Sequence, residues 1–382
     1  MSAKIVYFPV GNGDMTLIVT EDGKRVLIDA YIRAGEEYPD VINMLRNDYL
    51  TRDSKGRLFV DLFIWSHPDK DHCGGMNDHF HLGKPDEWSE KNDKIFINNI
   101  WSSPIVFRRS SKNNSLTSDA IALNKEVKRR VKLYRDNKKI GEDGDLVTIL
   151  GEDENGKTDD ILGIVCKLDD CLSVSPCMKG RLLGPSPRSE QEERESNLGK
   201  NHSSVIFNFE ITGDSKKVNY LCGGDAEVLC WEMLEERLTE NNNMSWVSYD
   251  ILLAPHHCSW HTLSNDSLSK KKEKGEEAVT SESAMKIFNS AKQNAKIISS
   301  SNVIEDNDVD PPAYRAMKEY ENILDDKSGQ FLCVAEHKNS DDENVPLEIN
   351  IEGSGLKIVP VARSMKESGE SAVNRRGGGG YA

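Results

Sequence analysis

The segment Ser66–Gly75 reads Ser-His-Pro-Asp-Lys-Asp-His-Cys-Gly-Gly, and four of its side chains are common metal ligands. His67, Asp69, Asp71 and His72 lie within six positions, directly after the apolar segment Leu62–Trp65. Imidazole nitrogens and carboxylate oxygens bind divalent cations at about 2 Å. A merely solvated polar loop is a poorer explanation, because so many ligand types rarely crowd together. The segment therefore predicts a divalent-metal site at a strand end.

Two later segments offer further ligands at the ends of apolar runs. Asp225 follows Gly223-Gly224 after the run Lys217–Cys222, and His256-His257 follow the run Ile251–Ala254. Each signal is weak alone, since Gly-Gly-Asp is a common turn and one histidine of a pair could simply be packed. If the three strands share one sandwich, however, their ends converge on one edge. Which of His256 and His257 faces a metal stays open, because adjacent strand residues point to opposite sides.

The elements that must position these residues form two β-rich halves. Apolar runs of strand length in the first half are Lys4–Val10, Thr16–Thr20, Arg25–Asp29 and Leu62–Trp65. Runs in the second half are Val205–Phe209, Lys217–Cys222, Ile251–Ala254, Lys296–Ser299, Phe331–Ala335, Leu347–Ile351 and Leu356–Val361. Helical spacing marks Tyr38–Tyr49, Ser118–Lys139, about 225–238, Ser283–Gln293 and Pro312–Leu324. This order predicts an α/β (α+β) protein of two packed sheets covered by helices, a four-layer sandwich.

The domain organisation follows from composition. We expect one domain over residues 1–362, in which about 103–200 form a polar, variable insertion, followed by a flexible tail over 363–382. The tail includes Arg375-Arg376 and four consecutive glycines, which cannot contribute to a core. It resembles the Arg-Gly-Gly tails of ubiquitin-like modifiers, so a protein partner could bind through it.

The spacing His67-x-Asp69-x-Asp71-His72 resembles the signature of the metallo-β-lactamase superfamily, in its H-x-D-x-D-H form. Five other segments fit the metallohydrolase domain of competence-type DNA-uptake channel proteins: Gly11–Asp14, Leu27–Asp29, Asn201–Ser204, Gly224-Asp225 and Pro255–Ser259. The resemblance covers about residues 4–340 and is weak over 103–200. It implies a four-layer αββα sandwich.

The resemblance also implies roles for individual residues. His67 and Asp69 would bind one metal ion, Asp71 and His72 a second, and Asp225 would bridge the two. Further ligands would be His256 or His257 at the second metal and His202 in the third motif. Asp71 would also hold a bridging hydroxide. Ser259 and His261 lie near these motifs in the sequence, so either could donate a proton to the leaving oxygen or bind phosphate. Asp69 stands where the family more often has His, which favours Mn²⁺ relative to Zn²⁺, and Cys258 stands where it usually has Gly.

The function implied is hydrolysis of phosphodiesters with two divalent ions, Zn or Mn, and a metal-bridging hydroxide, most simply as a nuclease acting on DNA. One alternative is hydrolysis of a small or cyclic nucleotide. Another is a non-catalytic, metal-stabilised interaction module. The partner expected is thus a nucleic acid or nucleotide substrate.

Charge and composition limit these functions. The 382 residues include 64 acidic and 49 basic side chains, a net charge of −15, which argues against a protein that coats nucleic acid nonspecifically. A local phosphate-tracking surface is still conceivable on the predicted helix Ser118–Lys139, whose cations are Lys125, Lys128, Arg129, Arg130, Lys132, Arg135, Lys138 and Lys139. No apolar run is long enough for a membrane span or a signal peptide. We therefore expect a cytoplasmic protein with reduced cysteines and no membrane partner.

Overall fold

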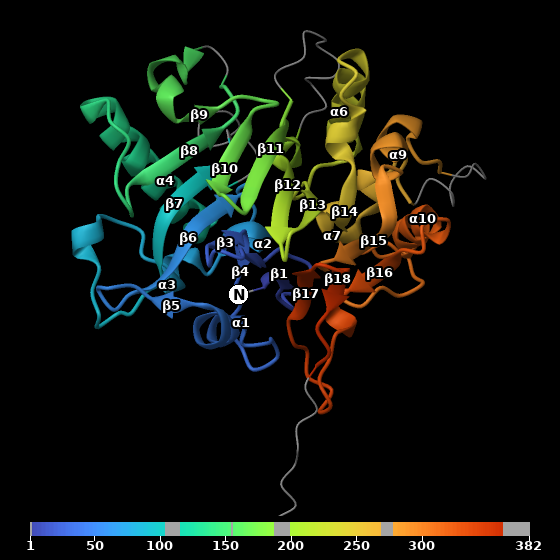
Figure 1. Ribbon diagram of the computed structural model, residues 1–382, viewed down its shortest axis with the longest axis horizontal. Coiled ribbons are helices and arrows are strands. Elements are labelled where there is room, and N and C mark those ends of the chain that lie inside the picture. The colour runs from blue at the N-terminus through green and yellow to red at the C-terminus, as the bar shows by residue number, and fades with distance from the viewer. Residues whose placement is uncertain (1, 104–114, 154–155, 187–198, 269–277, 362–382) are drawn as a thin grey trace, which may run out of the picture.

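Two β-sheets pack against each other in the computed structural model, which describes residues 2–103, 115–153, 156–186, 199–268 and 278–361 (Figure 1). The first sheet has ten strands and the second has seven. The glycine-rich tail, through which we expect a protein partner, lies outside the described residues.

The first sheet combines the N-terminal strands with the C-terminal hairpin. Its order is β18 (Gly355–Ile358), β17 (Leu347–Glu352), β1 (Ala3–Tyr7), β2 (Thr16–Val19), β3 (Arg25–Ile28), β6 (Leu58–Trp65), β7 (Phe96–Ser102), β8 (Leu146–Leu150) and β9 (Val165–Cys166). The short strand β5 (Thr51–Arg52) pairs with β6, and β4 (Ala30–Tyr31) follows β3. From β3 to β9 the neighbouring strands are parallel.

The second sheet is antiparallel at one side and parallel at the other. Its order is β10 (Cys171–Ser175), β11 (Met178–Gly184), β12 (Ile206–Gly213), β13 (Lys216–Cys222), β14 (Tyr249–Leu253), β15 (Ala291–Ser299) and β16 (Gln330–Cys333). Strands β13 to β16 are parallel. The ends of β6, β13 and β14, which precede the candidate ligands, are therefore all carboxyl ends of parallel strands.

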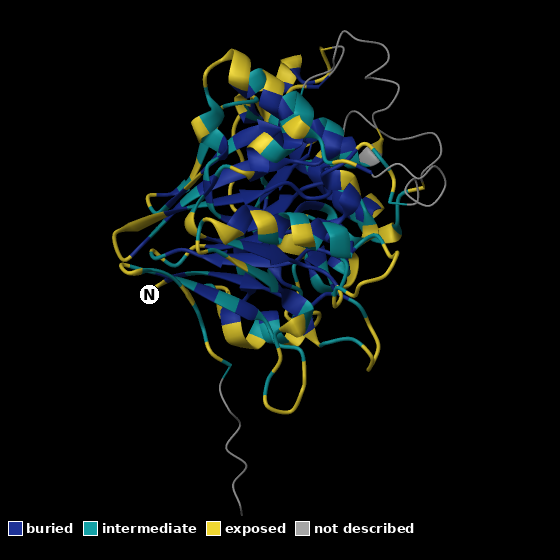
Figure 2. Ribbon diagram, turned by 90° about the vertical axis from the view of Figure 1, so that its right-hand side faces the viewer, coloured by how far each residue is buried: buried dark blue, intermediate teal, exposed yellow. Residues whose placement is uncertain are grey.

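Helices cover the outer face of each sheet. On the first sheet lie α1 (Val41–Met44), which continues as a π-helix over Leu45–Tyr49, and α4 (Ser118–Asn137), while the short helices α2 (Lys70–Cys73) and α3 (Met76–His79) follow β6. On the second lie α6 (Val228–Glu240), α9 (Glu282–Phe288) and α10 (Tyr314–Asp325), and the short α7 (Pro255–Cys258) follows β14. Figure 2 shows buried residues gathered in the sheets and exposed ones on the helices and loops.

The core has three apolar layers because strand residues alternate between faces. In β1, Val6 packs under the helices of the first sheet, whereas Ile5 and Tyr7 face the second sheet. In β12, Phe207 and Phe209 face the first sheet, and Ile206 packs under the helices of the second. Helix, sheet, sheet and helix thus stack in order. This is the four-layer αββα sandwich of metallo-β-lactamase type, and the predicted fold class is confirmed.

The segment 103–200, which we expected to be an insertion, belongs in its described parts to the sandwich itself. It supplies α4 and β8–β9 to the first half, and β10–β11 to the second sheet. Several of these strands are polar on one face, as in β10, where exposed Cys171 and Ser173 alternate with less exposed residues. That pattern explains why composition alone indicated an insertion.

Among the described helices, none is both long enough and apolar enough to cross a bilayer.

Candidate metal centre

The first ligand loop, residues 66–75, leaves the carboxyl end of β6. The backbone N–H of Ser66 donates to Asp29 Oδ1 (2.8 Å), which ties the loop to the end of β3. Asp69 is extended, and α2 starts after it, so His72 turns back toward the strand end. Gly75 has a φ of +84°, and a Cβ there would lie 2.7 Å from Ile32 Cβ. Glycine is therefore required where the loop folds back onto the first sheet.

The second ligand loop, residues 223–225, leaves the carboxyl end of β13 and carries Asp225. Gly224 has a φ of +49°, and a Cβ there would lie 2.9 Å from Ser66 Oγ. The absence of a side chain at Gly224 lets the two halves approach closely at this point. Asp225 is 2% exposed, so its carboxylate is placed against the first ligand loop in a buried position.

The third ligand loop, residues 255–258, leaves the carboxyl end of β14 in a strained turn. His256, His257 and Cys258 have φ values of +51°, +54° and +67°. Left-handed backbone costs about 1–2 kcal/mol per non-glycine residue. Hydrogen bonds hold the turn in place: His256 N–H donates to Gly224 O, and Cys258 O accepts from Ala313 N–H, both at 3.0 Å. Cys258 thus adopts a left-handed conformation that glycine would accommodate without strain.

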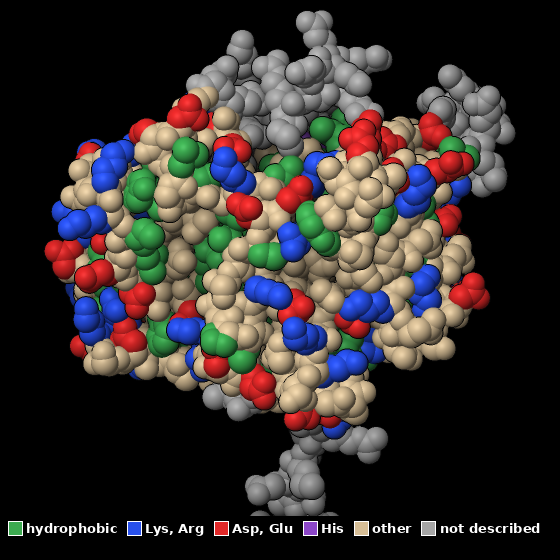
Figure 3. All heavy atoms as spheres, turned by 45° about the horizontal axis from the view of Figure 1, so that its top comes forward, with side chains coloured by type: hydrophobic (Ala, Val, Ile, Leu, Met, Phe, Trp, Pro, Cys, Tyr) green, Lys and Arg blue, Asp and Glu red, His purple; other side chains and the backbone are tan. Residues whose placement is uncertain are grey.

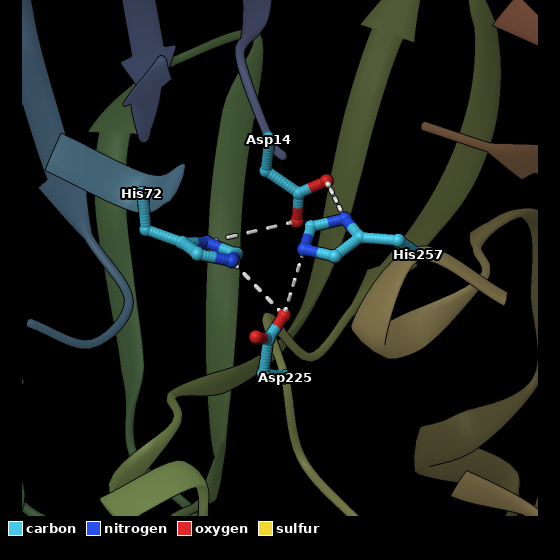
Figure 4. Close-up of side chains that lie close together, drawn as sticks. All are labelled: Asp14, His72, Asp225 and His257. Carbon is cyan, nitrogen blue, oxygen red and sulfur yellow. Dashed lines mark ion pairs between the residues drawn. The ribbon is translucent and has the colours of Figure 1, made fainter. Parts of the chain in front are cut away.

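One group of potential ligands surrounds Asp225 Oδ1. His72 Nε2 lies 2.9 Å from this oxygen and His257 Nε2 lies 3.4 Å from it. Asp71 Oδ2 is 3.3 Å from His257 Nε2. Figure 4 shows His72, Asp225 and His257 pointing toward one another, with Asp14 beside the two histidines. Ligand atoms of Asp14, His72, Asp225 and His257 all lie within 4.8 Å of one another.

A second group surrounds Asp225 Oδ2. His67 Nε2 lies 3.4 Å from this oxygen and 3.9 Å from Asp69 Oδ2. His256 Nε2 lies 3.7 Å from the same oxygen of Asp225. The two carboxylate oxygens of Asp225 thus face different groups, which is the arrangement that a ligand shared by two cations needs. Of the histidine pair, His257 joins the first group and His256 approaches the second.

Four buried polar atoms in these groups make no well-directed hydrogen bond among the described residues, although His72 Nε2 and Asp225 Oδ1 lie 2.9 Å apart. They are His67 Nε2, His72 Nε2, His257 Nε2 and Asp225 Oδ1. A buried polar atom without a partner costs about 1–3 kcal/mol. The three histidine Nε2 atoms converge on Asp225 from loops of both halves, and the mixed nitrogen and oxygen donors suit a borderline divalent cation. The residues present therefore fit a metal centre.

Hydrogen bonds at the other ring nitrogen orient the histidines. His72 Nδ1 is 2.8 Å from Asp29 Oδ2, and Ser66 Oγ, which donates to the same carboxylate, is 3.0 Å from His67 Nδ1. His257 Nδ1 is 3.1 Å from Ser300 O. Each Nδ1 faces the protein, so each Nε2 is directed to the centre. Such outer partners fix the tautomer of metal-binding histidines.

The carboxylates and histidines of the two ligand groups stabilise one another's charged forms. Burial alone would raise the pKa of Asp225, but His72, His257 and His67 hold it well below the usual range. Burial likewise would lower the pKa of His257, whereas Asp225 and then Asp14 and Asp71 raise it to about 10. Burial opposes a charge on His72 too, but Asp225 and Asp29 hold its pKa well above the ordinary value. The buried Asp225 carboxylate therefore stays ionised and requires nearby positive charge.

The two other predicted histidines lie outside both groups. His202 is buried, its Nδ1 accepts the N–H of Gly199 at 2.7 Å, and its Nε2 is 3.9 Å from Glu227 Oε2. The side chain of His261 is half exposed, with its Nε2 3.8 Å from Asp310 Oδ2. The structure thus brings together His67, Asp69, Asp71, His72, Asp225, His256 and His257 and does not add His202 or His261 to them.

Two carboxylates of the site were not among the predicted site residues. Asp29 supports His72, and Asp14 lies beside His72 and His257. Both were visible as parts of the resemblance, in Leu27–Asp29 and Gly11–Asp14. The available signal was a charged residue directly at the end or start of an apolar strand, which has to be either exposed or partnered.

No protein-family model matches the chain, and no curated protein matches it in sequence. Thirty-five chains of solved structures are similar in fold. Among them is yeast PDE1, in its unliganded form, at 13% identity and a TM-score of 0.41, covering 87% of this chain and 98% of that one. An isothiocyanate hydrolase from Delia radicum gut bacteria has 11% identity and a TM-score of 0.38, covering 89% and 97%.

A possible metal-dependent hydrolase from Veillonella parvula has 10% identity and a TM-score of 0.36, covering 87% of this chain and 96% of that one. Similarity this distant carries no argument about activity. The fold and the centre together define an αββα protein with a buried histidine–carboxylate site at the carboxyl ends of its parallel strands.

Proposed function

We propose that this protein hydrolyses phosphodiesters with the help of two divalent cations. The observation that carries the proposal is the convergence of the buried Nε2 atoms of His67, His72 and His257 on the Asp225 carboxylate, from ligand loops of both halves. Bound cations would supply Lewis-acid stabilisation of a phosphoryl group and would make water acidic enough to attack at neutral pH.

The chain's residues divide into two ligand sets that share Asp225. His67, Asp69 and His256 would hold one cation, and Asp71, His72 and His257 the other. The side chain of Asp71 is 31% exposed, whereas that of Asp225 is 3% exposed. Asp71 is therefore the carboxylate of its set with the best access to substrate, and it can orient the attacking water or hydroxide. Asp69 contributes an oxygen ligand and favours Mn²⁺ over Zn²⁺ in its set.

The finer part of the proposal is that the substrate is DNA. Its support is the resemblance of five segments to the metallohydrolase domain of competence-type DNA-uptake proteins. In this role His261, half exposed and four residues after His257, would donate the proton to the leaving oxygen, and His202 would act beside Glu227 at the edge of the centre.

A small or cyclic nucleotide is a second candidate, because four of the eight cations in the basic segment Ser118–Lys139 are paired with carboxylates. Arg129 pairs with Glu126 and Asp145, and Arg130 is buried against Glu126. The remaining paired cations are Lys132 with Asp136 and Arg135 with Asp160. On the face shown in Figure 3, acidic and basic side chains are interspersed. A polynucleotide would gain less from such a surface than from a continuous basic one.

The test is hydrolysis by metal-stripped protein reloaded with Mn²⁺ or Zn²⁺. Linear DNA, RNA, a cyclic dinucleotide and a chromogenic phosphodiester are compared, with Asp71→Ala as the inactive control. Cleavage of DNA that depends on the added metal and on Asp71 supports the proposal. Turnover of the cyclic dinucleotide alone supports the second candidate. A protein that binds fewer than two ions and cleaves none of the four would be a metal-stabilised interaction module instead.

A further inference from the structure

The loop Gly11–Asp14 joins the two halves beside the metal centre. The backbone N–H of Asp14 donates to Asp71 O at 3.0 Å, which anchors the loop to the first ligand loop. On the other side, Ser300 Oγ donates to Gly13 O at 2.6 Å, and Asn302 N–H donates to Asn12 Oδ1 at 2.9 Å. Ser300 and Asn302 follow β15, a strand of the second sheet. The position of the Asp14 side chain is therefore fixed relative to both halves.

The carboxylate of Asp14 is buried, at 4% exposure, and faces one histidine from each half. Its Oδ1 lies 3.6 Å from His257 Nδ1, and its Oδ2 lies 3.9 Å from His72 Nδ1 (Figure 4). On both rings the nearest nitrogen to Asp14 is Nδ1. The Nε2 atoms of the same rings are the ones that face Asp225.

Asp14 belongs to the group whose ligand atoms lie within 4.8 Å of one another, but it faces different nitrogens of the two histidines than Asp225 and Asp71 do. A carboxylate that shared a cation with His72 and His257 would be expected closest to their Nε2 atoms, where Asp225 and Asp71 lie. Asp14 instead lies behind the rings, on the side where Asp29 and Ser300 O hold Nδ1. His72 already has a carboxylate there, whereas His257 has only a backbone carbonyl, so Asp14 adds the missing negative charge.

We propose that Asp14 is a positioning residue that holds His72 and His257 together, so that one carboxylate aligns the metal-binding nitrogens of both halves. The inference rests on the metal centre proposed above. A carboxylate behind a histidine fixes the ring and raises the basicity of its other nitrogen, and loss of such a partner lowers metal affinity about 10- to 100-fold.

The experiment measures metal binding by purified full-length protein, without relying on turnover. Asp14→Asn keeps the shape of the side chain and removes its charge. Asp22→Asn is the matched control, because Asp22 follows the same strand β2 at its other end and is exposed. Ions per chain are counted by elemental analysis, Mn²⁺ and Zn²⁺ affinities are measured by competition with a chelator, and ¹⁵N NMR of the metal-loaded protein reports the imidazole nitrogens.

The expected result for Asp14→Asn is an unchanged number of ions, an affinity lower by about 10- to 100-fold, and shifted Nδ1 resonances of His72 and His257. Asp22→Asn should match the wild type in all three. Loss of one ion per chain would show that Asp14 is itself a ligand, and unchanged affinity would show that it has no role; either result overturns the inference. If the wild type itself binds no divalent ion, the proposed function fails. This outcome is distinguishable from failure of the inference about Asp14 alone, in which the wild type still binds its ions.

Discussion

The two halves of the sandwich contribute to one centre in different ways. The first half places four potential ligands within residues 67–72, on a loop backed by the carboxylate of Asp29. The second half supplies Asp225 after two glycines, and its histidines lie in a left-handed turn in which His257 Nδ1 is 3.1 Å from the backbone carbonyl of Ser300. The first half thus supplies its ligands from closely spaced positions in the sequence. The second half relies on an unusual left-handed backbone to place its histidines. Substitutions should therefore harm the halves by different mechanisms.

Removal of the ligand shared by both halves should have the largest effect. Asp225→Asn takes a negative charge from both ligand sets, so we expect loss of metal from both and a fall in phosphodiester turnover of about 1,000-fold, equivalent to about 4 kcal/mol of transition-state stabilisation. The control is Asp250→Asn, since Asp250 pairs with Lys292 at the opposite end of β14. Elemental analysis and initial rates check both variants. An Asp225→Asn variant that keeps two ions and full activity would contradict the claim that both ligand sets share Asp225.

The close approach of the halves at Gly224 can be tested separately from backbone strain. Gly224→Ala puts a Cβ 2.9 Å from Ser66 Oγ at a φ of +49°, whereas Gly23→Ala puts one at a φ of +85° with no atom within 4 Å. Strained backbone alone costs about 1–3 kcal/mol. Both variants should therefore be destabilised in urea unfolding, but only Gly224→Ala should also lose metal affinity. Equal metal affinity in the two variants would show that the contact with Ser66 does not matter.

The two halves also differ in how well their part of the centre could be predicted from the sequence. The ligands of the first half were recognisable because they are adjacent in the chain. Asp225 and the histidine pair were recognisable only jointly, as ends of strands. The choice between His256 and His257 was not readable, because three successive left-handed residues turn the loop away from strand alternation. Asp14 and Asp29 could not be assigned roles, since each acts through contacts with residues far away in sequence.

The fold was readable where the hydrophobic period was regular. The helix expected over Ser118–Lys139 is observed as α4, Ser118–Asn137, because its apolar residues recur at helical spacing. Strand β7, Phe96–Ser102, carries Asn98 and Asn99 in its middle, and β11, Met178–Gly184, includes Lys179 and two glycines. Both gain their stability from neighbouring strands rather than from local pattern, so sequence alone did not indicate them.

Strain in the third ligand loop predicts a smaller effect. Replacement of a cysteine by glycine should destabilise the protein less where the backbone is strained than where it is not. Cys258 and Cys222 are both buried, but only Cys258 has a left-handed backbone. Replacement by glycine should therefore cost about 1–2 kcal/mol less at Cys258 than at Cys222, because it also relieves strain there. Free energies of unfolding from urea titrations of Cys258→Gly and Cys222→Gly give the comparison. Equal losses would mean that the turn stores no strain that glycine can release.

The smallest expected effect concerns two cysteines on either side of the connection between the first and the second sheet. Burial raises the pKa of the Cys166 thiol, in β9 of the first sheet, to about 12, whereas Cys171, in β10 of the second, is exposed. Only thiolate is alkylated, so at pH 8 iodoacetamide should modify Cys171 well before Cys166. Because the folded pKa of Cys166 lies above its ordinary value of 9.0, the stability from keeping it neutral is present below pH 9 and lost as pH rises toward about 12. Peptide mass spectrometry identifies the modified cysteine, and early labelling of Cys166 would show that β9 opens.

The most direct test of the central claim is the number of divalent ions bound by metal-stripped protein after reloading and removal of excess metal. The account predicts two ions per chain for the wild type and loss of both in Asp225→Asn. A wild-type chain that binds no ion, or an Asp225→Asn chain that binds as many as the wild type, would contradict a metal centre shared between the two halves.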